Sequence, residues 1–190
     1  MSLPESLPRR VSVVGSTGTG KTTFGRELAS TLGLPFVELD AINWGPDWTM
    51  IGPERFQARV TEVVAQDRWV VDGNYGGQGI RELVWARADT IVWLDYGLPV
   101  IFLRLWRRTI ERIRSGEELW PGTGNRETLR NTFLSRESLF WWALKTHRRR
   151  RWSYARLLAL PQYAHARVHR FRRPRDAERW LAGVRSGRAP

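Results

Sequence analysis

The chain of 190 residues contains no cysteine, which excludes a disulfide framework and any metal site built from thiolates. It has no hydrophobic run that approaches the roughly 20 residues of a membrane-spanning helix, and the apolar stretch LFWWAL at residues 139–144 is far shorter. The first residues, MSLPESLPRR, include two prolines and no apolar core, so we expect no signal peptide. These absences predict a cytoplasmic protein with no membrane partner.

Lysine is almost missing as well, because only Lys21 and Lys145 are lysines among 31 basic residues. The net charge of +12 is unevenly placed. Residues 1–99 hold nine basic and twelve acidic residues, whereas residues 100–190 hold 22 and seven. The basic half could contact nucleic acid, a membrane surface or a polyanionic ligand such as a nucleotide. Solvated arginine-rich helices explain the surplus equally well, so nucleic acid is an open but not the favoured partner.

The rest of the composition, 42% hydrophobic and 26% charged, is that of an ordinary globular domain. Short apolar runs alternate with helical patterns, which is typical of an α/β fold with a parallel sheet and helices on both faces. We therefore expect one domain over residues 1–190, with no repeat or linker, and no feature specifies an oligomeric state. The predicted strands are 11–14, 35–40, 69–72, 90–95 and about 166–171, and the predicted helices are 21–32, 53–66, 80–87, 98–114, 127–149 and 174–184.

The most specific motif lies at residues 15–22, where GSTGTGKT matches the phosphate-binding pattern G-x-x-x-x-G-K-[ST] between a predicted strand and a predicted helix. Glycines let successive backbone N–H groups turn toward an anion, and the helix adds the positive end of its dipole. Lys21 can reach the β- and γ-phosphates, and the Thr22 hydroxyl can bind Mg²⁺. The residues expected to bind ATP are Gly15, Ser16, Thr17, Gly18, Thr19, Gly20, Lys21, Thr22 and Thr23.

Three aspartates, Asp40, Asp72 and Asp95, each end a predicted strand, and open α/β sheets bind their ligands at that edge. Asp72 and Asp95 are candidates to lie beside Mg²⁺ or its waters. Asp40 is a candidate to orient an acceptor group. Each could instead be a capping or turn residue.

Arginines are the second candidate group, because Arg104, Arg108 and Arg112 recur every four residues and form one stripe on the helix 98–114. Such a stripe suits triphosphate binding, although a solvated face has the same pattern. Arg126 lies in the glycine-rich segment SGEELWPGTGNRE and could close over the phosphates and exclude water. We expect a core at about 9–114 and 165–185, and a lid with its flanking helix at about 115–150. On the helix 98–114, the residues expected to face the core are Phe102, Leu105, Trp106, Ile110 and Ile113.

The absence of N-K-x-D and D-x-x-G strings argues against a GTPase, and a small phosphotransferase remains. Its predicted catalytic residues are Lys21, Asp40, Arg108, Arg112 and Arg126. Two alternatives stay open: a nucleic-acid-binding regulator that uses ATP as a switch, and an ATPase without an acceptor. Trp141 and Trp142, beside the run HRRRR, fit either single-stranded nucleic acid or the buried face of a helix.

With these residues in place, the chain resembles the adenylate-kinase-like P-loop kinases, and within them the branch of DNA topology modulation proteins. The resemblance rests on GSTGTGKTT, LDAINW, WVVDGNY with the following IR and RADT, and LDYGLP, and it covers about residues 10–114. It implies a five-stranded parallel sheet in the order 2-3-1-4-5, ATP with Mg²⁺, and a phosphoryl acceptor. We expect that acceptor to be nucleotide-like or nucleoside-like.

The resemblance also implies an acceptor site at the second and third strands. Asp40 is similar to the acidic residue that holds a substrate hydroxyl in small-molecule kinases of this superfamily. Asp72 and Gly73 match the start of a D-G-[FY]-P-R motif, from which Asn74 and the next residue depart. Arg81 is the nearest arginine that could hold an acceptor phosphate. The expected acceptor residues are Asp40, Asn43, Trp44, Asp72, Gly73, Asn74 and Arg81.

Overall fold

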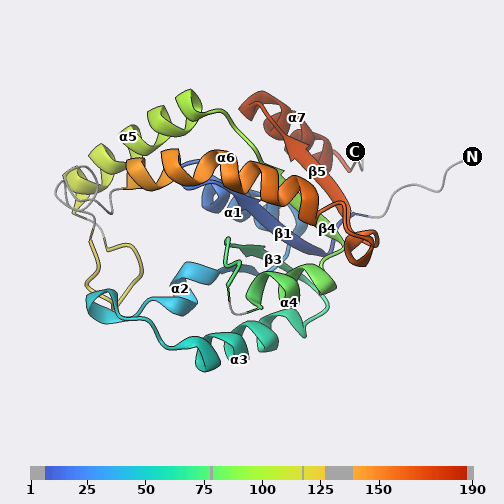
Figure 1. Cartoon of the computed structure of the whole chain (residues 1–190), viewed down its shortest axis with the longest axis horizontal. Coiled ribbons are helices and arrows are strands. Elements are labelled where there is room, and N and C mark those ends of the chain that lie inside the picture. The colour runs from blue at the N-terminus through green and yellow to red at the C-terminus, as the bar shows by residue number, and fades with distance from the viewer. Residues whose placement is uncertain (1–6, 78, 117, 127–138, 188–190) are drawn as a thin grey trace, which may run out of the picture.

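The computed structural model describes residues 7–77, 79–116, 118–126 and 139–187, with side chains from residue 144 onward in the last range. The elements along the chain are β1 (Arg10–Gly15), α1 (Lys21–Leu32), β2 (Phe36–Glu38), α2 (Leu39–Asn43), η1 (Pro46–Trp48), α3 (Pro53–Val64), β3 (Trp69–Asp72), α4 (Ile80–Arg87), β4 (Thr90–Leu94), α5 (Leu98–Ser115), α6 (Leu139–Leu157), η3 (Pro161–Tyr163), β5 (Arg167–Phe171) and α7 (Pro174–Arg185). Figure 1 shows this course in colour from the N-terminal to the C-terminal end.

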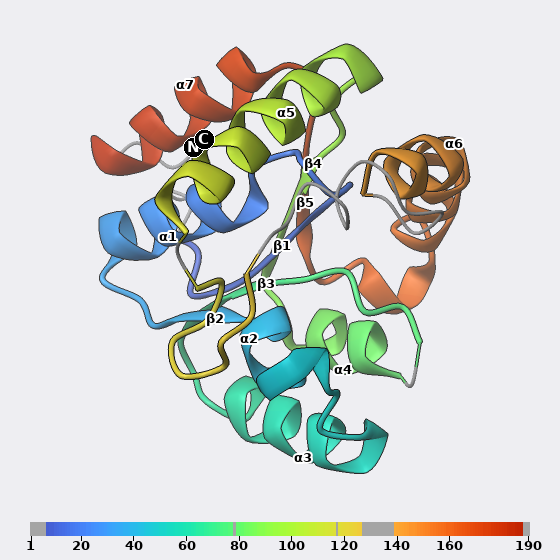
Figure 2. The ribbon, with the colours of Figure 1, turned by 90° about the vertical axis from the view of Figure 1, so that its left-hand side faces the viewer.

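The five strands form one parallel sheet in the order β2-β3-β1-β4-β5, which confirms the predicted order. Helices α1, α5 and α7 cover one face, and α3, α4 and α6 lie on the other (Figure 2). Strands β3 and β4 are buried throughout and β1 is buried from Val11 onward, as expected for parallel strands covered on both faces. In β1 the side chains alternate, so that Val13 packs under α1 and Val14 packs toward α3 and α4. The predicted three-layer fold is therefore confirmed.

Most predicted helices begin and end within two residues of the positions observed in the structure, because the residues that signal helix ends lie next to those ends in the sequence. Gly33 ends α1 in the left-handed conformation with φ of 60°, a backbone that glycine adopts without steric cost. Proline lies in the first turn of α3, α5 and α7. Among the helices described, none is long and apolar enough to cross a bilayer.

Three expectations were wrong in detail. Asp40 does not end a strand, since β2 stops at Glu38 and Asp40 lies in the first turn of α2. The side chain of Trp106 is 54% exposed, because the buried line of α5 runs through Ile101, Leu105 and Thr109, about 100° away from it. Helix α6 continues to residue 157 instead of ending at 149. Residues 127–138 of the predicted helix, and the side chains of Trp141 and Trp142, lie outside the described part.

Candidate functional site

The GSTGTGKT loop joins β1 to α1 at the carboxyl edge of the sheet, and its glycines are required by close contacts. A Cβ at Gly15 would lie 2.6 Å from the backbone oxygen of Leu94. A Cβ at Gly18, where φ is +79°, would lie 2.5 Å from Cγ of Leu105 on α5. The Thr19 hydroxyl donates a 2.8 Å hydrogen bond to the Ser16 carbonyl and closes the loop on itself. Contacts with β4 and α5 and its own internal hydrogen bond thus define the shape of the loop.

Lys21 lies over this loop, and its Nζ donates to the carbonyl of Ser16 at 3.3 Å. Burial lowers the pKa of the Lys21 amine, and the charges of Asp72 and Asp40 oppose that shift. Arg108 lies close enough to lower the same pKa further. An ammonium group between two carboxylates and a second cation is suited to an anion placed above the loop.

Thr22 and Asp72 meet directly, since the Thr22 hydroxyl donates a 2.6 Å hydrogen bond to Oδ2 of Asp72. Burial raises the pKa of Asp72 to about 6, although Lys21 and the Thr22 hydrogen bond favour its ionised form. Its Oδ1 is buried and accepts no hydrogen bond from any residue that the structure describes. A hydroxyl and an orphaned carboxylate oxygen are hard oxygen ligands of the kind Mg²⁺ prefers, so these residues fit that ion.

This oxygen pair is not a complete metal cage. Within the described ranges no group of three or more His, Asp or Glu side chains could hold a metal alone. Mg²⁺ in phosphotransferases is commonly held by one or two protein groups, with phosphate oxygens and waters completing the shell. The site fits that incomplete arrangement.

Glu38, which the sequence analysis missed, is a third carboxylate at this edge. It ends β2, and its charge raises the pKa of Asp72. Its Oε1 accepts a 3.4 Å hydrogen bond from Nε1 of Trp120, and its Oε2 lies 3.3 Å from the Arg26 guanidinium. The signal available in the sequence was its place at the carboxyl end of a predicted strand, two residues before Asp40.

Asp40 lies on α2 with an exposed carboxylate that Tyr75 orients. The Tyr75 hydroxyl donates a 2.6 Å hydrogen bond to Oδ1 of Asp40, and Nδ2 of the buried Asn43 donates to the same hydroxyl at 3.2 Å. Burial, together with the charge of Asp40, raises the pKa of Tyr75, so the phenol stays protonated and remains a donor. Asn43 thus contributes through Tyr75, a residue missing from the predicted site.

Asn74 and Gly73 follow β3 and serve the loop. A Cβ at Gly73 would come 2.7 Å from the Leu39 side chain, so the chain needs glycine where it passes α2. The Asn74 amide bonds to Gly15: Oδ1 accepts from the Gly15 N–H at 3.1 Å, and Nδ2 donates to the Gly15 carbonyl. Asn74 was expected to bind the acceptor, whereas the structure places its side chain against the loop.

Arg81 lies at the start of α4 on the same side of the sheet. Its guanidinium pairs with Glu82 and lies over the Trp85 ring, 5.5 Å from the centroid. Its Nε is buried and donates to no residue in the described ranges. An arginine held in this way keeps further N–H donors that could bind an anion.

Two arginines of the predicted α5 stripe lie near the loop. Nη1 of Arg104 donates to the Thr19 carbonyl at 2.7 Å, and Arg108 follows one turn later beside Lys21. Arg112 is half-buried another turn away, and Arg126 is exposed. The roles predicted for Arg108, Arg112 and Arg126 stay predictions.

Asp95 is placed differently from Asp72. Its carboxylate is 4% exposed and lies 2.7 Å from the guanidinium of Arg170 and 3.1 Å from that of Arg151. Two arginines therefore compensate its charge. Thr22 bonds to Asp72 and not to Asp95. The structure therefore brings two of the three predicted Mg²⁺ ligands together and gives the third an ion-paired place between β4, β5 and α6.

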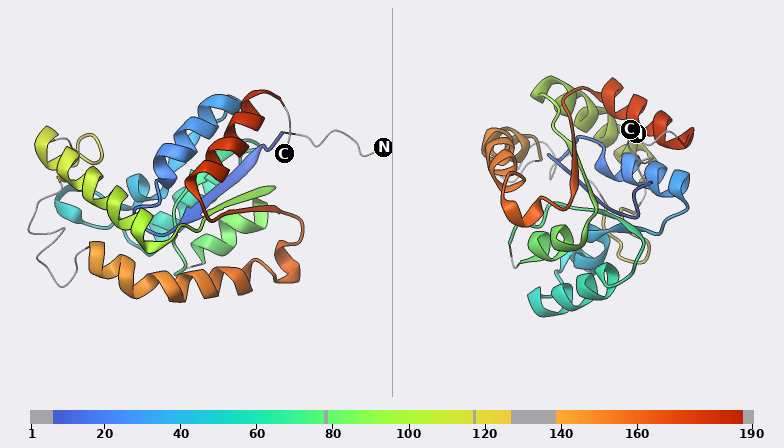
Figure 3. Two further views of the ribbon diagram at one scale, coloured as in Figure 1. Left: turned by 90° about the horizontal axis from the view of Figure 1, so that it is seen from above. Right: turned by 90° about the vertical axis from the view of Figure 1, so that its right-hand side faces the viewer.

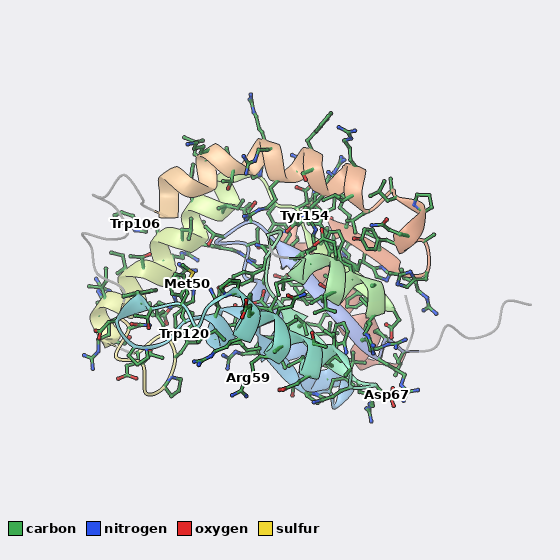
Figure 4. The ribbon with its side chains drawn as sticks, turned by 60° about the horizontal axis from the view of Figure 1, so that its bottom comes forward. Met50, Arg59, Asp67, Trp106, Trp120 and Tyr154 are labelled. Atoms are coloured by element: carbon green, nitrogen blue, oxygen red, sulfur yellow. The ribbon has the colours of Figure 1, made fainter. Side chains whose placement is uncertain are left out.

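The segment after α5 folds back on the turn that follows α2. Nδ2 of the buried Asn125 donates to the Gly45 carbonyl at 2.9 Å, and its Oδ1 accepts from the Trp48 N–H at 3.0 Å. Trp120 meets Trp48 edge to face at 6.0 Å, and Trp48 meets Trp44 at 5.9 Å. Met50, which Figure 4 labels together with Trp120, forms an isolated antiparallel bridge with Trp44. Part of the predicted lid therefore contacts the predicted acceptor side.

Helix α6 reaches the same edge of the sheet, which the sequence analysis did not foresee. Arg150 is half-buried, and its charge lowers the pKa of Lys21. One turn later the Tyr154 hydroxyl donates to Oδ1 of Asn74 at 3.1 Å. The complete absence of Asp and Glu from this helix was the available signal.

A cavity of about 300 Å³ lies beside the loop, between the start of α1 and α7. These two helices run side by side on one face of the sheet (Figure 3). The guanidinium of Arg104 lies over the Tyr96 ring, 5.2 Å from its centroid, at this cavity. The other residues that line it near the loop are Gly20, Thr23, Phe24 and Pro174.

Comparison with known proteins agrees with this geometry. The family described as ATPase family associated with various cellular activities (AAA) matches residues 11–71, which include the loop and reach into β3 but end before Asp72. The shikimate kinase of Synechococcus elongatus is 31% identical over 105 residues, which are 49% of this chain and 55% of that protein. The shikimate kinase of Synechococcus sp. CC9902 is 30% identical over 119 residues, 55% of this chain and 62% of that protein. The chain spans about half the length of the curated relatives it matches.

Solved structures share the whole fold at low identity. The shikimate kinase of Acinetobacter baumannii in complex with shikimate has a TM-score of 0.56 and 21% identity, covering 98% of this chain and 97% of that one. A gluconokinase from Sinorhizobium meliloti has a TM-score of 0.54 and 17% identity, covering 97% and 94%. The predicted resemblance to DNA topology modulation proteins stays a prediction. The chain therefore has the fold of the P-loop NTPases, and the relatives named above are kinases.

Proposed function

We propose that the chain is an ATP-dependent small-molecule kinase that transfers the γ-phosphoryl group to an acceptor hydroxyl. The observation that carries the proposal is the arrangement around Lys21. Two carboxylates act on this one amine: Asp72, bonded to Thr22 of the loop, and Asp40, oriented by Tyr75 on the acceptor side.

ATP would bind along the loop with its base and ribose in the cavity beside Gly20. The N–H groups of the loop and the start of α1 suit the phosphates. Arg104 and Tyr96 give the cavity a stacked cation and ring, which suits a planar base. Thr22 and Asp72 would hold Mg²⁺, which supplies charge neutralisation on the phosphate oxygens when it is bound.

The acceptor is inferred from the charge of Asp40. An exposed carboxylate repels a phosphate dianion but accepts a hydrogen bond from an alcohol, so a hydroxyl is favoured over the phosphate of a nucleoside monophosphate. Shikimate kinases and a gluconokinase are among the relatives, and their names refer to hydroxy acids. Arg81 would suit the acid group of such a molecule. The nucleoside-like acceptor predicted from sequence also carries a free hydroxyl, so nucleosides are included among the acceptors to be tested.

The reaction needs little covalent chemistry from the protein. The acceptor oxygen forms a bond to the γ-phosphorus as the bond to the bridging oxygen of ADP breaks. The hydroxyl proton passes to the Asp40 carboxylate, which the Tyr75 hydrogen bond keeps oriented. Lys21 and Arg108 stabilise the charge on the transferred group.

The test is a panel of acceptors with Mg-ATP, in which ADP release is measured and the phosphorylated product is identified by ³¹P NMR. The panel contains hydroxy acids, sugars, nucleosides and nucleoside monophosphates. The Lys21→Ala variant should lose ATP binding and transfer, whereas Lys145→Ala, which removes the other lysine from an exposed place on α6, should keep both.

Three results would overturn the proposal. The first is transfer to no acceptor together with unchanged ATP binding by Lys21→Ala. The second is phosphate release that no acceptor alters, which would identify an acceptor-free ATPase. The third is tight, steeply salt-dependent DNA binding without transfer, which would identify a nucleic-acid-binding regulator because counterion release scales with phosphate contacts.

A further inference from the structure

Asn74 lies just beyond the last paired residues of β1 and β3, where the pairing of the two strands stops. Strands β1 and β3 pair in parallel with Val13 opposite Asp72, and the same register assigns Gly15 to Asn74. Gly15 has left the ladder with β3, although it still pairs with Leu94 of β4 on its other side. The side chain of Asn74 fills the missing place by accepting from the Gly15 N–H and donating to its carbonyl.

Among side chains in their usual protonation states at neutral pH, only a carboxamide offers an acceptor and a donor side by side in one plane. Aspartate would place a second acceptor against the Gly15 carbonyl, and alanine would leave both backbone groups without their partner. The chemistry of position 74 is therefore matched to the first glycine of the phosphate-binding loop.

The same amide is bound from the opposite side by α6. Oδ1 of Asn74 accepts a 3.1 Å hydrogen bond from the Tyr154 hydroxyl. Tyr154 is 4% exposed and packs edge to face on Trp85 and Trp93, at 5.6 and 5.8 Å, so its position is fixed. Figure 4 labels Tyr154 between α6 and the sheet. One amide thus contacts the loop and the helix together.

Helix α6 carries Arg150 one turn before Tyr154, on the same face of the helix. Arg150 is half-buried, and none of the described residues forms an ion pair or hydrogen bond with it. Its guanidinium lies close enough to influence both Lys21 and Tyr154. His147 and Arg151 fix the helix to the residues that follow β4, through the Tyr96 carbonyl and Asp95, but neither of those two contacts reaches the loop.

We propose that Asn74 is a positioning residue. Through its bonds to Gly15 and to the Tyr154 hydroxyl, it fixes the position of α6 relative to the phosphate-binding loop and so places Arg150 at the anion bound by Lys21. The inference rests on the proposed function only in requiring that the loop binds ATP. It adds a structural coupling between β3, the loop and the helix that follows the lid.

The experiment is a double-mutant cycle on the affinity for Mg-ATP, measured by isothermal titration calorimetry on the full chain. The Arg150→Ala change should weaken binding about tenfold in the wild type, the effect expected of one charge-assisted contact. In an Asn74→Ala or Tyr154→Phe background, the same change should weaken binding less than about twofold, because the guanidinium is no longer placed. Asn74→Asp should behave as Asn74→Ala does.

Matched controls separate positioning from general damage. Arg149→Ala removes the neighbouring exposed arginine of α6, and Tyr163→Phe removes the hydroxyl of a second tyrosine that packs on Trp85. Both controls should bind ATP as the wild type does, and thermal unfolding should show that Tyr154→Phe stays folded. Where transfer can be assayed, Tyr154→Phe should lower kcat more than it raises KM for ATP.

The possible failures are distinguishable. If the wild type does not bind Mg-ATP, the proposed function fails. If ATP binds and the effects of Arg150→Ala and Asn74→Ala are additive, or if Asn74→Asp restores wild-type affinity, the coupling through Asn74 is wrong while the kinase proposal stands.

Discussion

Replacing Asp72 by asparagine should stabilise the free protein above about pH 6 and remove its response to Mg-ATP. Burial is the largest cause that raises the pKa of this carboxyl from 3.8 to about 6. Asparagine keeps the size of the side chain and an oxygen that can accept the Thr22 hydrogen bond. The change therefore removes the buried charge while leaving the packing in place.

The magnitude follows from the two pKa values. Because the pKa in the folded protein lies above the unfolded value, the carboxyl contributes its full stabilisation below 3.8 and loses it as the pH rises through about 6. A rise of about two pKa units corresponds to about 3 kcal/mol, at about 1.36 kcal/mol per unit. The Asp72→Asn variant should thus gain up to about 3 kcal/mol over the wild type between about pH 4 and pH 8.

Urea denaturation across that pH range measures this difference in the free energy of unfolding. Asp67→Asn, in the exposed turn before β3, is the matched control and should show no such pH-dependent gain (Figure 4). With Mg-ATP added, the wild type should be stabilised and Asp72→Asn should not. The reasoning is refuted if the difference between variant and wild type stays constant over the range, or if the variant is the less stable protein at the alkaline end.

Three further changes test other parts of the molecule. Gly18→Ala should abolish ATP binding in calorimetry, because its Cβ would lie 2.5 Å from a side chain of α5 and its φ of +79° disfavours alanine; unchanged affinity would contradict the loop geometry. Arg170→Met should lower the free energy of unfolding by about 3 kcal/mol in urea, since it leaves the buried Asp95 with one partner. Asn125→Ala should expose the turn at residues 45–48 to limited proteolysis, and equal cleavage rates would refute its role in holding that turn.

The fold and the phosphate-binding loop could be predicted because their signals are local. The loop motif occupies eight consecutive positions, and buried parallel strands read as short continuous apolar runs. The stripe that includes Arg104 and Arg108 was visible for the same reason, since it depends only on helical spacing.

The partners of the aspartates could not be predicted, because they come from distant parts of the chain. Asp95 is held by Arg170, 75 residues away, and Asn74 bonds to Gly15 across 59 residues. Nothing in the sequence near Asp95 distinguishes it from Asp72, although one is ion-paired and the other is bonded to the loop. Such pairings depend on how α6 and β5 dock, which residue spacing does not specify.

Asp40 was misplaced for a different reason. The run PFVELD has the apolar pattern of a strand, but Leu39 is 2% exposed and packs in the core beneath α3 and α4. That tertiary contact overrides the local preference and begins α2 one residue earlier than Asp40. The error changed the element that carries the carboxylate while leaving it at the predicted edge of the sheet.

The amide of Asn74 has a consequence for how the molecule opens. The Asn74 side chain extends the hydrogen bonding of β1 as far as Gly15. The Gly15 N–H is therefore protected from hydrogen exchange by the sheet and not by the loop. Its hydrogen exchange should therefore follow the slow opening of the central strands, whereas the N–H groups after Gly15 should exchange with the faster local motion of a loop. The boundary between the rigid and the mobile part of the nucleotide site would then fall between Gly15 and Ser16, within the motif itself.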